Sequence, residues 1–112
     1  MYSVSISQLK QVMNNENVID IRDIEKFNGS HIMGAHNIPM IKLLSDYSKY
    51  LDKNKVYYIY CQKGITSIRV VGFLRKQGYN VYNVIGGYER WVLDNWDLVN
   101  LNLLICDIIF IE

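Results

Sequence analysis

The clearest pattern in this chain is a run of apolar and aromatic positions over 56–60, with no charged residue among them. A strand that lacks polar alternation is typical of a parallel sheet that is covered by helices on both faces. A similar run over 80–84 and a β-branched run over 18–21 predict two more strands, and 4–6 is a short alternating segment. The pattern therefore predicts a sheet with a buried centre.

Segments with helical spacing separate these runs. Apolar positions predict helices over 8–13, 41–50, 67–77 and 88–93. Ser7 is placed to cap the first helix and Gly78 to end the third, and 22–39 is rich in turn residues. Because strands alternate with helices, we expect a three-layer α/β domain with a central, mostly parallel sheet flanked by helices.

Composition limits the classes of binding partner and the cellular locations to be expected. The 112 residues carry a formal net charge of +1, so no broad basic field predicts binding to nucleic acid. Two cysteines, Cys61 and Cys106, lie too far apart for a disulfide framework, which favours a reducing compartment. The sequence shows neither a signal-peptide pattern nor an apolar run of about 18 residues. We expect a cytoplasmic protein that binds neither nucleic acid nor membranes.

Cys61 is the strongest candidate for chemistry, because it follows the buried strand directly and precedes a helix. Ligands of parallel sheets collect at the carboxyl ends of the strands. The N-terminus of a helix stabilises an anion and lowers the pKa of a nearby thiol. The bland alternative is that Cys61 is a small, inert core residue, as free cysteines often are.

The loop after Cys61 is the candidate substrate-binding segment. Its residues are Gln62, Lys63, Gly64, Ile65, Thr66 and Ser67. Their successive backbone N–H groups could surround an anion on the sulfur, since glycine at position 64 allows the loop to curl. Lys63 adds a cation, and the hydroxyl of Thr66 or Ser67 can cap the following helix. These neighbours favour the functional interpretation of Cys61.

Three segments in order resemble the signatures of the rhodanese family of sulfurtransferases. The loop 61–66 is similar to the family's active-site loop, and two flanking stretches, 18–39 and 78–91, are similar to its N-terminal and C-terminal signatures. The resemblance implies a rhodanese-like fold over 1–95 and a catalytic Cys61 that carries sulfur as a persulfide. Many loops of the family carry arginine where this chain has Gln62.

The family mechanism implies a thiosulfate or persulfide donor and a thiophilic acceptor such as cyanide, another thiol or a partner protein's cysteine. It requires no metal or organic cofactor. The alternative is a sulfur-carrier or protein-interaction module that turns over free thiosulfate poorly. A phosphatase or arsenate reductase is the third reading, and it needs an arginine six positions after the cysteine, where this chain has Ser67.

Other polar and aromatic residues have simpler readings. His31 and His36 could be general bases or metal ligands, but we expect them to be polar turn residues. Arg22 could line the pocket with Asp20, but we expect it to pair with Asp23 or Glu25. The three tyrosines of 57–60 are expected in the core. The segment 96–112 is an apolar C-terminal extension whose β-branched density suggests an added strand, with Cys106 as a packing residue.

Overall fold

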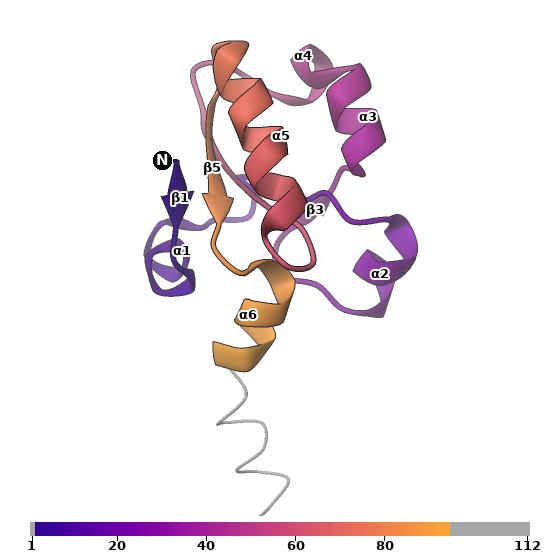
Figure 1. The fold of residues 1–112 in the computed structure, drawn as a ribbon, viewed down its shortest axis with the longest axis vertical. Coiled ribbons are helices and arrows are strands. Elements are labelled where there is room, and N and C mark those ends of the chain that lie inside the picture. Colours follow the sequence, from indigo (N-terminus) through magenta and orange to yellow (C-terminus); the bar gives the residue numbers. More distant parts are fainter. Residues whose placement is uncertain (1, 95–112) are drawn as a thin grey trace, which may run out of the picture.

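A parallel sheet forms the centre of the molecule. The structure is a computed structural model that describes residues 2–94. Five strands lie in the order β1-β5-β4-β2-β3, and every neighbouring pair is parallel. The strands are β1 (Ser3–Val4), β2 (Val18–Asp20), β3 (His36–Asn37), β4 (Val56–Tyr60) and β5 (Asn80–Val84) (Figure 1). The predicted bounds of the strands over 56–60 and 80–84 are confirmed.

Helices cover both faces of this sheet. One layer contains α1 (Ile6–Val12), α2 (Ile24–Gly29) and α6 (Gly87–Asp94), and the other contains α3 (Met40–Ser45), α4 (Tyr47–Tyr50) and α5 (Ile65–Lys76). Neighbouring residues of β4 serve the two layers, because Ile59 packs with Leu74 whereas Tyr60 packs with Leu9. The expected three-layer α/β fold is confirmed.

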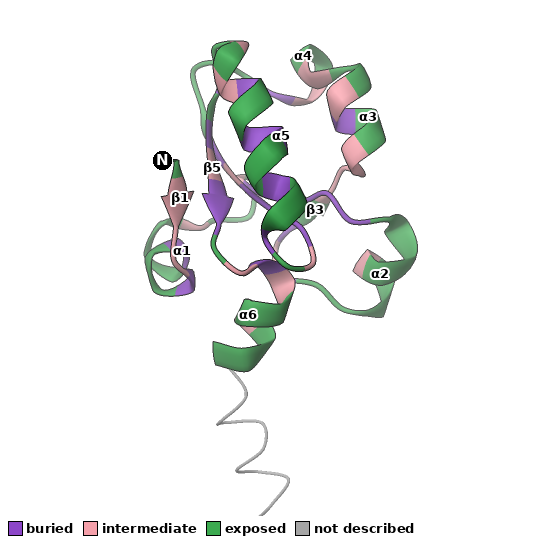
Figure 2. Ribbon diagram, in the orientation of Figure 1, coloured by how far each residue is buried: buried purple, intermediate pink, exposed green. Residues whose placement is uncertain are grey.

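The helix α5 shows how burial follows the helical repeat. Its buried residues are Ser67, Val70, Val71 and Leu74. Figure 2 shows these buried turns alternating with exposed ones along α5. Ser67 is the only polar member of this buried face, and it lies in the first turn, close to Cys61.

Two predicted helices differ from the observed ones. The prediction that Ser7 caps a helix over 8–13 is wrong, because α1 begins at Ile6 and Ser5 caps it. The Ser5 hydroxyl accepts the Gln8 N–H at 3.1 Å and Gln8 Oε1 accepts the Ser5 N–H at 2.8 Å, so the two residues form a capping box. The single helix expected over 41–50 is divided into α3 and α4 at Asp46, whose φ of −150° is not helical.

The segment 22–39, read as turns, contains two short regular elements. In α2, the Asp23 side chain accepts the Lys26 N–H at 3.0 Å and so caps the helix. Strand β3 pairs with β2 through two registered positions. Hydrophobic periodicity could not reveal elements this short.

Among residues 2–94, no helix is both long and apolar enough to span a membrane. The boundary of the domain at residue 95 remains a prediction. The extra strand proposed for 96–112, and the packing role of Cys106, concern residues outside the described part of the chain.

Candidate active site

Cys61 lies at the carboxyl edge of the sheet, directly after the central strand β4. The chain then turns through a short loop and enters α5 at Ile65, two residues before the predicted start. Gly64 precedes the helix with a φ of 83°, in the left-handed region that favours glycine. The predicted cap by Thr66 or Ser67 is wrong, since Gly64 occupies the N-cap position and has no side chain to cap the helix.

The amides at the start of α5 point at the sulfur instead. Cys61 Sγ accepts the Gly64 N–H at 3.2 Å and the Ser67 N–H at 3.3 Å. The Ser67 hydroxyl lies on the same sulfur, with an Sγ–Oγ distance of 3.2 Å. Two backbone N–H donors and a hydroxyl therefore surround the atom that would carry a negative charge.

Two opposing effects act on the thiol. Burial raises the pKa of Cys61, whose residue is only 6% exposed. Hydrogen bonds from the Ser67 side chain, and from the backbone of Ser67, Gly64 and Lys63, lower the pKa and outweigh burial, so the pKa lies below its ordinary value. The surroundings therefore favour the thiolate, which is the nucleophilic form.

The start of α6, together with Gly86 just before it, contacts this loop through backbone atoms. The Tyr88 N–H donates to the Cys61 carbonyl at 2.9 Å, and the Glu89 N–H donates to the Gln62 carbonyl at 3.0 Å. A Cβ on Gly64 would lie 2.8 Å from the nitrogen of Gly86, and a Cβ on Gly87 would lie 2.8 Å from that of Gly64. The glycines allow two loops to touch through their backbones.

Gln62 lies between two charged side chains. Its Oε1 accepts a hydrogen bond from Arg22 Nη1 at 3.0 Å, and its Nε2 donates to Glu89 Oε2 at 3.3 Å. Its amide thus joins the end of β2 to α6, and its role in substrate binding remains a prediction.

Arg22 supports the loop from the end of β2, through an acidic partner other than the predicted ones. It pairs with Asp20 at 2.8 Å, not with Asp23 or Glu25, and both partners are buried. Its guanidinium lies 4.2 Å from the centroid of the Tyr88 ring, a cation–π contact. Asp20 is the last residue of β2, so the pair joins this strand to the segment that follows it.

An open cavity of about 320 Å³ lies at the mouth of the site. Its lining residues are Lys26, Cys61, Gln62, Lys63, Ile65 and Thr66. Lys26 comes from α2 and was not a predicted site residue, although it lies within the motif-bearing stretch 18–39. Two lysines therefore line a cavity that Cys61 also lines, and both suit an anionic ligand.

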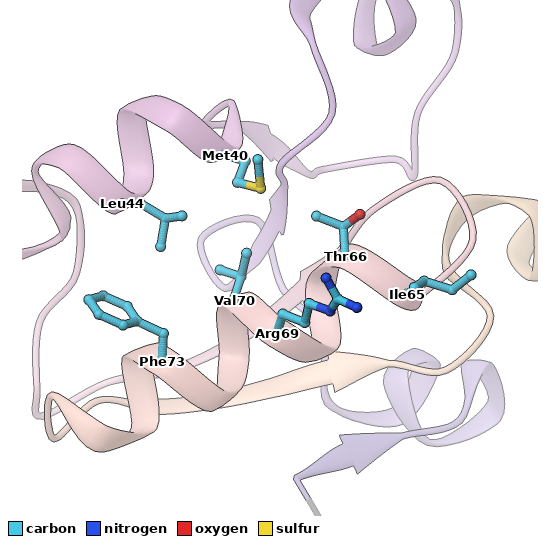
Figure 3. Close-up of a pocket in the computed structure, with 7 residues that line it drawn as sticks. All are labelled: Met40, Leu44, Ile65, Thr66, Arg69, Val70 and Phe73. Atoms are coloured by element: carbon cyan, nitrogen blue, oxygen red, sulfur yellow. The ribbon is translucent and has the colours of Figure 1, made fainter.

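A larger apolar groove adjoins this cavity, sharing Ile65 and Thr66 with it. It measures about 560 Å³ and lies between α3 and α5 (Figure 3). Its other lining residues are Met40, Leu44, Arg69, Val70 and Phe73. Arg69 thus lines the groove outside the loop that surrounds the sulfur.

The remaining candidate residues have structural partners. His31 stacks on Phe27 with ring centroids 3.7 Å apart, and His36 Nε2 lies 2.6 Å from the Asn15 carbonyl oxygen. Within residues 2–94, no group of three or more His, Cys, Asp and Glu side chains could hold a metal ion. Tyr57 and Tyr60 are buried in the core, as expected.

Known proteins resemble this chain in sequence and in fold. A family model described as "Rhodanese-like domain" matches residues 5–94. A Coxiella burnetii protein named thiosulfate sulfurtransferase GlpE is 40% identical over 75 residues, which cover 66% of this chain and 69% of that protein. A Bacillus subtilis protein named uncharacterized protein YqhL is 39% identical over 75 residues, which cover 66% of this chain but only 59% of the relative, less than two thirds.

The fold is also similar to that of a solved structure. The crystal structure of a rhodanese-related protein from Thermoplasma volcanium superposes with a TM-score of 0.77 at 28% identity. The match covers 84% of this chain and 93% of that one.

Proposed function

We propose, from the premise that this chain belongs to the rhodanese-like domain family, that it is a sulfurtransferase in which Cys61 carries sulfane sulfur as a persulfide. The observation that supports this most directly is the position of Cys61 Sγ. It accepts two backbone N–H groups, and Cys61 lines an open cavity together with two lysines.

The first step uses the thiolate that these contacts favour. Cys61 Sγ attacks the outer sulfur of thiosulfate, the sulfur–sulfur bond of the donor breaks, and sulfite leaves with the electron pair. A persulfide donor reacts in the same way and leaves as a thiolate. The product on the protein is Cys61–S–S⁻, a covalent intermediate.

The second step returns the thiolate. A thiophilic acceptor attacks the terminal sulfur, and Cys61 leaves with the electron pair of the persulfide bond. Cyanide becomes thiocyanate, and a thiolate becomes a new persulfide. Fixed backbone donors stabilise the charge in both steps, and by analogy with a single oxyanion-hole donor each is worth about 3–4 kcal/mol.

Residues in the cavity and in the adjoining loop have different roles in binding the donor. Lys26 and Lys63 supply positive charge, while Ile65 and Thr66 form the wall toward the groove. Gly64 and Ser67 contribute N–H groups to the sulfur. Gln62 acts through its bonds to Arg22 and Glu89, which hold the loop in place.

A second function, sulfur carriage to or from a protein partner, is favoured by a specific observation. The cation that many loops of this family place after the cysteine is replaced by Gln62, and an apolar groove adjoins the cavity. A partner's thiol would then be a better acceptor than cyanide. Fast transfer from a protein persulfide with slow formation of thiocyanate from thiosulfate would favour this function.

Intact-mass measurement after incubation with thiosulfate tests the proposal. We expect the protein to gain the mass of one sulfur atom and to lose it again when cyanide is added. Cys61→Ser should abolish the gain, whereas Cys106→Ser, which keeps Cys61, should retain it. An unchanged mass with thiosulfate and with every persulfide donor tried would refute the proposed function.

A further inference from the structure

A chain of polar groups leads from Cys61 into the protein. In the thiol form, Cys61 Sγ donates to Ser67 Oγ at 3.2 Å. The Ser67 hydroxyl donates to Asn83 Oδ1, and Asn83 Nδ2 donates to Ser3 Oγ at 3.4 Å. The chain thus joins the end of β4 to α5, β5 and β1.

The two middle members of this chain are sealed in the core. Ser67 is 0% exposed and Asn83 is 2% exposed, and the neighbouring buried positions of β5 are Val81 and Val84. A buried amide without partners costs about 1–3 kcal/mol, so an apolar residue would fill this position more cheaply. Asn83 is therefore explained by its polar contacts and not by packing.

The sulfur needs different partners in its two charge states. A thiol can donate a hydrogen bond, whereas a thiolate can only accept one. Ser67 has a single hydroxyl proton, so it cannot donate to the sulfur and to Asn83 Oδ1 at the same time. When Ser67 turns toward a thiolate, the orientation of Asn83 described above leaves its Oδ1 without that donor.

A half-turn of the Asn83 amide removes this conflict. Nδ2 then donates to Ser67 Oγ, and Oδ1 accepts from the Ser3 hydroxyl, since an amide offers both a donor and an acceptor. A cavity of about 150 Å³ beside Asn83 and Ser3 leaves room for the movement. Every member of the chain has a partner in both directions.

We propose that Asn83 is a positioning residue whose amide reverses the Cys61–Ser67–Asn83–Ser3 hydrogen-bond chain, so that Ser67 accepts from the thiol and donates to the charged sulfur. The inference rests on the proposed function, because the thiolate is the state that begins each cycle. The proton of the thiol leaves to solvent through the cavity that Lys26 and Lys63 line. No group is oxidised or reduced.

Charged and titratable groups also surround the loop from other elements. They are Asp20 and Arg22 at the end of β2, Lys26 on α2, Lys63 in the loop, Arg69 on α5, and Tyr88 and Glu89 on α6. All of them remain in every variant compared below, so their contributions cancel in the comparison.

The rate of Cys61 alkylation by iodoacetamide as a function of pH tests the reversal, with Cys106→Ser as the background. In Asn83→Asp the side chain offers only acceptors, so the Ser67 hydroxyl donates to it and not to the thiolate. We therefore expect the midpoint of the profile to rise by about one pH unit. In the Ser67→Ala background the same change should raise the midpoint less, leaving only the effect of the added charge. Equal rises in the two backgrounds would overturn the proposal.

Asn83→Leu is the uncharged control of similar shape. It removes two hydrogen bonds from each charge state of the chain, one to Ser67 and one to Ser3, so a reversible chain predicts an unchanged midpoint. A clear fall would mean that Asn83 only accepts from Ser67, and a clear rise would mean that it only donates. Either result would overturn the reversal.

The unmodified protein provides a measurement that does not depend on the folding of a variant. NMR signals of the Asn83 side-chain amide should move as pH crosses the titration of Cys61, with a new contact between the Nδ2 protons and Ser67. Cys61→Ser should abolish this movement. An amide signal that stays still while Cys61 titrates would refute the proposal.

These readouts involve no sulfur transfer, so the two proposals can fail separately. A protein that gains no sulfur but shows the coupling would refute the proposed function alone. A protein that gains sulfur without the coupling would refute the role of Asn83 alone.

Discussion

Cys61 is buried and also lies among fixed hydrogen-bond donors. The donors lower the pKa of its thiol more than burial raises it. A buried thiol without them would be a poor nucleophile, because burial alone raises its pKa. Each donor comes from a residue whose position is set by another element, since Gly64 touches Gly86 and Ser67 lies in the buried face of α5. The geometry of these donors thus favours the thiolate form of Cys61.

This arrangement makes stability depend on pH. The folded thiol has a pKa below the ordinary value of 9.0, so the folded protein releases its proton first as pH rises. The stabilisation is complete above 9.0, and it is lost as pH falls through the lower, folded pKa. Urea unfolding of the native protein and of Cys61→Ser should therefore show a difference that grows with pH up to about 9.0. A constant difference would contradict it.

The residues behind the cysteine could not be read from the sequence. Cys61 and its loop stand out because an apolar strand, a glycine and hydroxyl residues follow one another directly. Asn83 lies within a strand pattern and Arg22 in a turn-rich stretch, so neither carries a local signal. Their partners, Ser67 and Gln62, are 16 and 40 residues away, and only the packing of the sheet brings these pairs together.

The first turn of α5 connects the sheet to the sulfur of Cys61. Its first amides reach the sulfur only because the loop before it turns tightly at Gly64, with a positive φ. Gly72 lies in the same helix without a positive φ, and a Cβ added there would meet nothing within 4 Å. Position 64 therefore requires glycine, whereas position 72 can accept a residue with a Cβ.

Alanine substitutions should separate these two requirements. We expect Gly64→Ala to lower the free energy of unfolding by at least about 1–2 kcal/mol, because a Cβ is strained in this backbone region and would meet Gly86. Gly72→Ala should raise it by about 0.5–1 kcal/mol, since alanine is the better helix former. Denaturant titration measures both, and a neutral Gly64→Ala would show that the loop can relax.

The two helical layers meet the sheet through separate cores. One surrounds Ile59 and Leu74 and the other surrounds Tyr60 and Leu9, and both lie within residues 2–94. The match to the family model also ends at residue 94. The molecule thus holds the sheet, both cores and the candidate active site in the part that we propose as the domain.

Truncation after Asn95 tests this proposal at the scale of the molecule. We expect the shortened chain to unfold cooperatively in a circular-dichroism melt and to gain one sulfur atom from thiosulfate, since every contact argued above is retained. A chain that does not fold, while the full-length protein does, would show that the domain extends beyond residue 95.

The sequence by itself determined the order of the main elements, the parallel sheet and the place of Cys61 after the central strand, because hydrophobic periodicity and turn residues act locally along the chain. It also carried the family resemblance, which depends on motifs in order. The supports of the site depended on tertiary structure. Arg22 reaches Gln62, Gly87 packs on Gly64, and Asn83 meets Ser67 only after the strands have aligned, since each contact joins segments that the fold alone makes neighbours.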